Sequence, residues 1–201
     1  MEITWLKEGS FILKDNKNSI IINPITGTKA KGPFTTAVLL TSDHNEYATD
    51  IITSAGTKIT DWPGEYEIGG CLIQGVEIPD TNDGTIHTAF SITSPEKITF
   101  AFLGSNMHGL SSSALEDLGN IDVLIIPITE NEQRTFKNIH AVIDDIGPSY
   151  VIPAYYSSDE DFLSFAKNIG ISPQEKKKSI KFTKSMVGGE IVVLAPLEKS
   201  E

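Results

Sequence analysis

The order of strand and helix patterns along the 201 residues most constrains the fold of this chain. Short runs rich in Ile, Val, Thr and Phe dominate the first half, at 10–13, 19–23, 37–40, 71–76, 85–93 and 97–103. Single strand-like runs then alternate with helical patterns, at 122–127, 150–153, 180–182 and 190–194. Strands first and strand–helix alternation afterwards predict an α/β (α+β) protein with two mixed sheets and helices outside them.

Helical spacing of apolar residues indicates helices at 46–54, 114–118, 132–146 and 159–169. Ser111, Ser112 and Ser113 supply N-cap hydroxyls for the second of these, and Gly170 ends the last. Turn residues predict a hairpin loop at 82–84, a second hairpin turning at Pro95, and a structural turn over 63–70 with solvated acids. No repeat or long linker interrupts the pattern, so residues 1–201 are predicted to form one domain.

Composition narrows the partners that we expect. The net charge of −11 argues against binding to nucleic acid or to an anionic membrane, because both need a basic surface. Cys71 is the only cysteine and falls in an apolar run, so we expect a buried thiol, no disulfide and no thiolate metal cluster. The start, MEITWLKEG, lacks signal-peptide character, and no apolar run approaches the 18 or so residues of a spanning helix. We therefore expect a soluble, acidic, cytoplasmic protein that could form a homo-oligomer through an edge strand or apolar patch.

One segment carries most of the functional information. The apolar run 37–40 ends in Thr41, and the polar cluster Ser-Asp-His-Asn-Glu-Tyr follows at once. This arrangement resembles the strand and loop of the metallo-β-lactamase superfamily, which reads Thr-His-x-His-x-Asp-His. Further matches, in the same order along the chain, are ITWLKEGSFIL, PGEYEIGG, FLGS, DVLIIP and VIPAYY. The chain is most similar to small, stand-alone members that are usually described as candidate metal-dependent hydrolases.

The resemblance implies a four-layer αββα sandwich and a two-zinc centre, but most of the metal ligands are replaced. Positions where the family has ligands carry Ser42, Tyr47, Ser105 and Tyr155. His44 is kept, and Glu46 stands in for an aspartate. Outside the ligand positions, Asn23 and Glu8 also replace family residues. One histidine with one carboxylate is too small a donor set for a tight zinc site.

The sequence therefore favours a non-hydrolytic protein with a binding, assembly or regulatory role, without catalytic residues or a cofactor, and with an unnamed protein or small-molecule partner. Tyr47 and Tyr155 would then fill the old metal cavity and could contact a small ligand. The alternative is a hydrolase of a small ester, lactone or phosphorylated metabolite, with a single zinc or manganese on His44, Glu46 and His108. There a metal-bound water would be the nucleophile. The remaining histidines, His87 and His140, are expected to be structural and surface residues, respectively.

Overall fold

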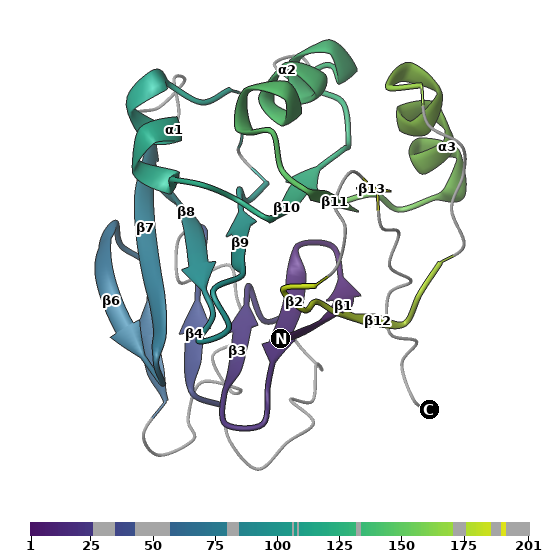
Figure 1. Ribbon diagram of the computed structural model, residues 1–201. Helices are drawn as coiled ribbons and strands as arrows, with labels where there is room; N and C mark the ends of the chain where they lie inside the picture. Colours follow the sequence, from purple (N-terminus) through teal and green to yellow (C-terminus); the bar gives the residue numbers. More distant parts are fainter. Residues whose placement is uncertain are drawn as a thin grey trace.

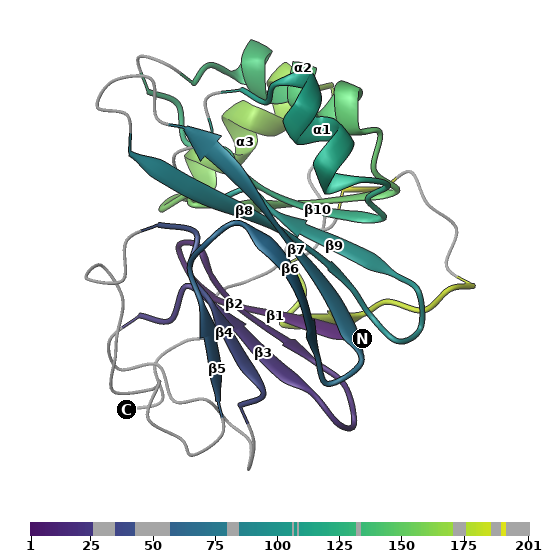
Figure 2. The ribbon, with the colours of Figure 1, turned by 90° about the vertical axis from the view of Figure 1, so that its left-hand side faces the viewer.

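The computed structural model describes residues 1–25, 35–42, 57–79, 85–105, 107, 109–131, 134–170, 176–185 and 190–191. Their strands form two mixed sheets that lie face to face, with helices over the outer face of one sheet (Figures 1 and 2). The predicted helix at 46–54 and the hairpin loop at 82–84 lie outside these residues.

The six-stranded sheet contains the N-terminal strands. Its order is β12 (Ser179–Lys181), β1 (Glu2–Lys7), β2 (Ser10–Lys14), β3 (Ser19–Ile22), β4 (Ala37–Leu39) and β5 (Lys58–Thr60). The first four strands pair antiparallel, whereas β3–β4 and β4–β5 are parallel. The carboxyl ends of β3 and β4 therefore lie side by side.

The seven-stranded sheet lies between the first sheet and the helices (Figure 2). Its order is β13 (Glu190–Ile191), β11 (Tyr150–Ala154), β10 (Val123–Pro127), β9 (Thr99–Phe102), β8 (Ile86–Thr93), β7 (Cys71–Pro79) and β6 (Gly64–Ile68). Strands β6 to β9 form an antiparallel meander, and β9, β10, β11 and β13 are parallel. The loops after β9, β10 and β11 consequently meet at one edge of this sheet.

In the described part of the chain, three helices connect or follow the parallel strands: α1 (Ser112–Leu118), α2 (Phe136–Ile146) and α3 (Asp159–Asn168). Hydroxyl groups cap each of them, because Ser111, Thr135 and Ser158 accept hydrogen bonds from backbone N–H groups of the first turn. The predicted serine cap of α1 is confirmed at Ser111, although the helix begins at Ser112 and not at 114, and the predicted stop at Gly170, where φ is +74°, is confirmed. None of the helices in the described chain has both the length and the apolar character needed to cross a membrane.

Two sequence-based boundaries were wrong for identifiable reasons. Helix α2 begins at Phe136 and not at 132, because Asn131 and Arg134 close a turn through two hydrogen bonds and Thr135 then caps the helix. The 63–70 segment is not only a turn, because β6 occupies Gly64–Ile68 and only Gly69 and Gly70 turn into β7. Its acids are exposed as predicted.

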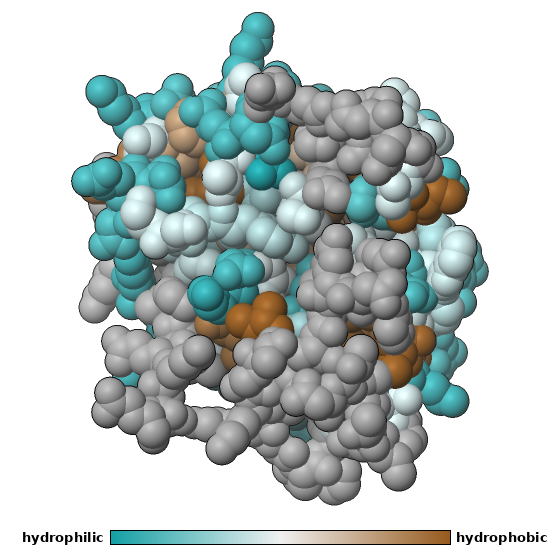
Figure 3. All heavy atoms as spheres, turned by 180° about the vertical axis from the view of Figure 1, so that it is seen from behind, coloured by the Kyte–Doolittle hydropathy of each residue, from teal (hydrophilic) through white to brown (hydrophobic). Residues whose placement is uncertain are grey.

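One apolar core joins the facing surfaces of both sheets and extends beneath the helices. Ring contacts span the sheets, as between Phe11 of β2 and Phe102 of β9, whose centroids are 5.8 Å apart. Burial of apolar side chains from both sheets in one core favours folding as a single unit. On the face in Figure 3, the apolar side chains that are described form separate small patches among hydrophilic ones.

Candidate functional site

The carboxyl ends of the parallel strands in the six-stranded sheet place Asn23 beside Thr41. Asn23 follows β3, and its backbone N–H donates to the Leu39 carbonyl at 2.9 Å. Its side-chain oxygen accepts from the Thr41 backbone N–H at 2.8 Å, and its amide nitrogen donates to the Thr41 hydroxyl at 2.8 Å. Both residues are buried. The Asn23 carboxamide is therefore held in one orientation.

Tyr155 links this pair to the seven-stranded sheet. It follows β11, and its phenol oxygen accepts a hydrogen bond from the Asn23 amide nitrogen at 3.1 Å. The Thr129 hydroxyl, in the loop after β10, donates to the Tyr155 carbonyl. The strand ends of both sheets thus meet at one hydrogen-bonded centre, which is also where the resemblance places metal ligands.

The Tyr155 ring occupies the space beside Gly9. A Cβ atom on Gly9 would lie 1.9 Å from Cζ of Tyr155, so only glycine admits the ring in this position. The backbone N–H of Tyr155 donates to the Glu8 carbonyl at 3.2 Å, which also accepts from the Trp5 indole at 2.7 Å. The adjoining space between the sheets, bounded also by Phe11, Phe102 and Ile125, has no room for a water molecule. Tyr155 therefore fills this position.

Backbone strain concentrates at the same place. Glu8, Asn23 and Tyr155 have φ values of 51°, 48° and 55°, and Lys97 is the only other non-glycine residue with positive φ in the described chain. Left-handed backbone costs free energy for residues with a Cβ, and it persists where surrounding contacts hold it. Gly104 completes the group with φ of +76°, and a Cβ there would lie 2.8 Å from the Thr41 hydroxyl oxygen.

A buried guanidinium ties together the loops after β9 and β10. Arg134 is 5% exposed, and its Nε donates to the Thr129 carbonyl at 2.7 Å. Its Nη1 donates to the Ser105 carbonyl and to the Met107 carbonyl at 3.5 Å. Burial lowers the pKa of Arg134, and its interaction with Tyr155 opposes that shift. No carboxylate among the described residues forms an ion pair with this guanidinium.

Arg134 and Gly9 were not identified as site residues from the sequence. Arg134 is the only arginine in the chain, against fifteen lysines, and that imbalance is a signal for a site that needs a planar, multidentate donor. Gly9 lies in the opening motif, but nothing in the sequence marks the ring that it accommodates.

The described residues of this site do not fit a zinc centre. They contribute a phenol, a carboxamide, hydroxyl groups and a guanidinium, whereas zinc takes histidine, thiolate and carboxylate ligands. No group of three or more His, Cys, Asp or Glu in the described ranges could hold a metal ion. Ser42 is buried next to Thr41, and Ser105 lies against Arg134. His44, Glu46, Tyr47 and His108 lie outside the described residues.

The remaining candidates lie away from this centre. Cys71 is buried in β7, as predicted, and burial raises its pKa to about 11, with a further contribution from Asp15. His87 is buried in β8. His140 is on the surface of α2, with Nε2 at 3.7 Å from the Asp144 carboxylate. Neither the cysteine nor these histidines join the Tyr155 centre.

Solved structures with the same fold have diverged far in sequence. A candidate Zn-dependent hydrolase of the metallo-beta-lactamase superfamily from Thermotoga maritima matches with a TM-score of 0.78 and 22% identity, over 96% of this chain and 97% of that one. A candidate metal-dependent hydrolase from Parabacteroides distasonis matches with a TM-score of 0.68 and 15% identity, over 97% and 93% of the two chains. A metallo hydrolase from Ignicoccus hospitalis matches with a TM-score of 0.65 and 14% identity, over 90% of this chain and 99% of that one. The predicted fold class, a metallo-β-lactamase-like arrangement of two mixed sheets and helices, is thereby confirmed.

Comparison at the sequence level reaches the same family. Curated proteins give no match. The profile of the beta-lactamase superfamily domain, in contrast, matches residues 2–155, which hold the Asn23, Thr41, Arg134 and Tyr155 side chains of the candidate site. Because this match spans most of the chain, the protein belongs to the family that the profile describes, the beta-lactamase superfamily domain.

Proposed function

We propose that this protein is a non-hydrolytic member of its family, with a binding, assembly or regulatory role. The observation that carries the proposal is the position of Tyr155. Its ring fills the space over Gly9, and its phenol bonds to Asn23 where the resemblance places a histidine ligand. A neutral phenol is a poor zinc ligand, and here its oxygen already accepts a hydrogen bond.

The network supports this role because its members satisfy one another. Asn23 uses its carboxamide oxygen and nitrogen on Thr41 and Tyr155, and Tyr155 is held further by Thr129 and Glu8. A buried polar group without a partner costs about 1–3 kcal/mol, so a satisfied network stabilises this end of the sandwich. We infer that the site serves a structural or binding purpose without a metal ion.

Metal content tests the proposal directly. We expect purified protein to contain far less than one metal ion per chain, and its Tm to stay unchanged when zinc or manganese is added at micromolar concentration. A panel of ester, lactone and phosphate substrates should give no turnover above background. Stoichiometric metal, or a large rise in Tm, would instead favour the hydrolase with His44, Glu46 and His108 as ligands.

A designed reversal sharpens the test. The triple variant Ser42→His, Ser105→Asp and Tyr155→His restores family ligands at three positions, so we expect it to gain a zinc-dependent rise in Tm. Tyr155→Phe is the matched control, because it removes the hydroxyl without adding a nitrogen ligand and should gain none. If the unmodified protein already responds to zinc as the triple variant does, the proposal is wrong.

A further inference from the structure

We propose that strand β6 binds an extended, basic peptide segment, which adds to the edge of the seven-stranded sheet as a further strand. This inference goes beyond the role proposed for the Tyr155 centre and does not depend on it. It rests on the backbone of β6, on the carboxylates beside it, and on the Ser91 side chain, which has no hydrogen-bond partner among the described residues.

Among the described strands, the backbone of β6 is unpaired along one side. Within the described strands, β6 is the terminal member of its sheet and pairs only with β7. A groove of about 600 Å³ runs beside it, bounded by Thr36, by Lys58–Thr60 of β5, and by Glu65–Gly69. An edge strand presents unpaired N–H and C=O groups, and extended peptides use such groups to join a sheet.

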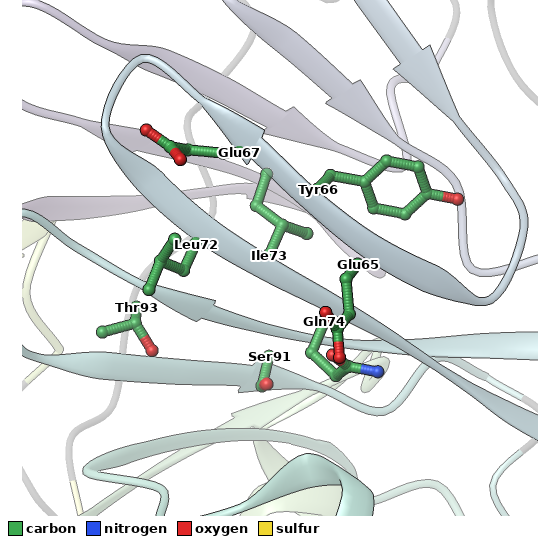
Figure 4. A pocket seen from close by; sticks show the side chains of 8 residues that line it. All are labelled: Glu65, Tyr66, Glu67, Leu72, Ile73, Gln74, Ser91 and Thr93. Carbon is green, nitrogen blue, oxygen red and sulfur yellow. The ribbon is translucent and has the colours of Figure 1, made fainter.

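The outer face of this edge is acidic and hollowed (Figure 4). The register places Glu65 opposite Gln74 and Ser91, and Glu67 opposite Leu72 and Thr93, in two cross-strand rows. These six side chains, with Tyr66 and Ile73, line a hollow of about 430 Å³. Two carboxylates on neighbouring rows thus flank a common space.

Several polar groups in the hollow have no partner among the described residues. Ser91 is only 5% exposed, and its hydroxyl makes no hydrogen bond within the described residues. Glu65, Glu67 and Gln74 likewise form no ion pair or side-chain hydrogen bond there. The Ser91 hydroxyl lines this acidic hollow and is suited to accept a hydrogen bond from a cationic donor.

Charge and spacing favour a basic, extended partner. Alternate residues of a strand point to the same face about 6.8 Å apart, so a strand paired with β6 would place two side chains beside Glu65 and Glu67. Lysine suits this position because its ammonium reaches a carboxylate while its methylene groups cover apolar surface. Leu72, which is 51% exposed in the same hollow, provides that surface.

A second copy of this chain fits the edge poorly. Antiparallel pairing of β6 with itself about Tyr66 would place Glu65 of each copy opposite Glu67 of the other. Like charges directly opposite one another destabilise a sheet. The partner that complements this edge is therefore a different, positively charged segment.

The test uses a capped, fluorescently labelled ten-residue peptide of alternating lysine and threonine. The protein is titrated into this peptide, and binding is measured as a rise in fluorescence anisotropy. We expect saturable binding that weakens as salt is added, and no binding of the same peptide with glutamate in place of lysine. The double variant Glu65→Gln, Glu67→Gln should weaken binding about fivefold or more. The matched control, Glu116→Gln with Asp117→Asn on the exposed face of α1, removes the same charge and should not change the affinity.

Hydrogen exchange separates strand addition from simple charge attraction. Saturating peptide should slow amide exchange in β6, and Tyr155→Phe should leave the peptide affinity unchanged. The inference fails if the α1 control weakens binding as much as the β6 variant, or if the β6 amides keep their exchange rates. Failure to bind the lysine peptide, or self-association through β6 in sedimentation experiments, would equally overturn it.

Discussion

Tyr155 combines an uncommon backbone conformation with a fixed side-chain position. Its φ of 55° would be costly for an isolated tyrosine, and the contacts to Glu8, Thr129 and Asn23 maintain it. The neighbouring Tyr156 turns into the core instead, where its ring lies 4.9 Å from that of Trp5. Two consecutive tyrosines therefore serve different purposes, one at the site and one in the packing beneath it.

Gly9→Ala should destabilise the protein by about 1–3 kcal/mol, because the new methyl group collides with the Tyr155 ring. Urea unfolding would measure this change. In a Tyr155→Ala background, most of the cost should disappear. Gly109→Ala is the matched control, since a Cβ there meets nothing within 4 Å. An equal cost of Gly9→Ala in both backgrounds would show that the ring does not cause it.

The Cys71 thiol should resist modification in the folded protein. Burial raises its pKa to about 11, so the thiolate is scarce at pH 8, and the side chain has no access to solvent. A colorimetric thiol reagent should react with it only after unfolding in denaturant. The variant Ser113→Cys places a second thiol at an exposed position and should react at once. Rapid reaction of native Cys71 would contradict its burial.

The candidate site was only partly predictable at the level of single residues. The resemblance placed Ser42, Ser105 and Tyr155 at positions where the family has metal ligands, and in the structure the Tyr155 ring fills the space beside Gly9. The pairing of Asn23 with Thr41 could not be foreseen, because it depends on the parallel register of β3 and β4, two strands separated in sequence. Arg134 was missed because its guanidinium donates to backbone carbonyls, which no sequence pattern records.

At the level of elements, local signals predicted the cap of α1 and the stop after α3, but they missed the start of α2 and one edge strand. The serine cap of α1 and the glycine that follows α3 are short-range features, so the sequence alone displays them. Strand β6 alternates exposed Glu65 and Glu67 with half-buried Tyr66 and Ile68. The neighbouring Pro63, Gly64 and Gly69 suggested a turn and obscured this period of two. Pairing with β7 is a tertiary contact, and it decided the conformation.

Helix α3 should lose stability in acid through its capping box. Hydrogen bonds from the Ser158 hydroxyl and from the Ser157 and Ser158 backbone amides lower the pKa of Asp161 below its usual value of 3.8. A carboxyl with a depressed folded-state pKa stabilises the fold above its unfolded pKa, and this contribution disappears as the pH falls through the folded value. Tm should therefore decrease when the pH is lowered below about 4.

Asp161→Asn should make that acid-dependent loss of Tm smaller. Ser158→Ala should lower Tm at pH 7, because it removes the hydroxyl that caps the first turn. Asp117→Asn on α1 is the control, and it should leave the decrease of Tm at acid pH unchanged. If Asp161→Asn has the same pH profile as the unmodified protein, the capping box does not contribute to the acid sensitivity.

For the whole molecule, the sequence predicted the architecture because the order of strands and helices is a global pattern. It could not predict which strands lie at the edges, since that depends on pairing over long distances in sequence. The shared core of the two sheets predicts a single cooperative unfolding transition. Far-UV circular dichroism and global hydrogen exchange should report the same free energy of unfolding. Two separate transitions would contradict the prediction of one domain.

Trp5 gives the molecule an optical reporter of its own. Its indole is 2% exposed, lies in tilted contact with the Tyr156 ring, and shares the Glu8 carbonyl with the backbone of Tyr155. The other tryptophan, Trp62, is 65% exposed, so Trp62→Phe leaves a single emitter beside the strand ends. A ligand that displaces Tyr155 should therefore change the Trp5 fluorescence. A library of unlabelled compounds could then be screened by the intrinsic tryptophan fluorescence of the protein.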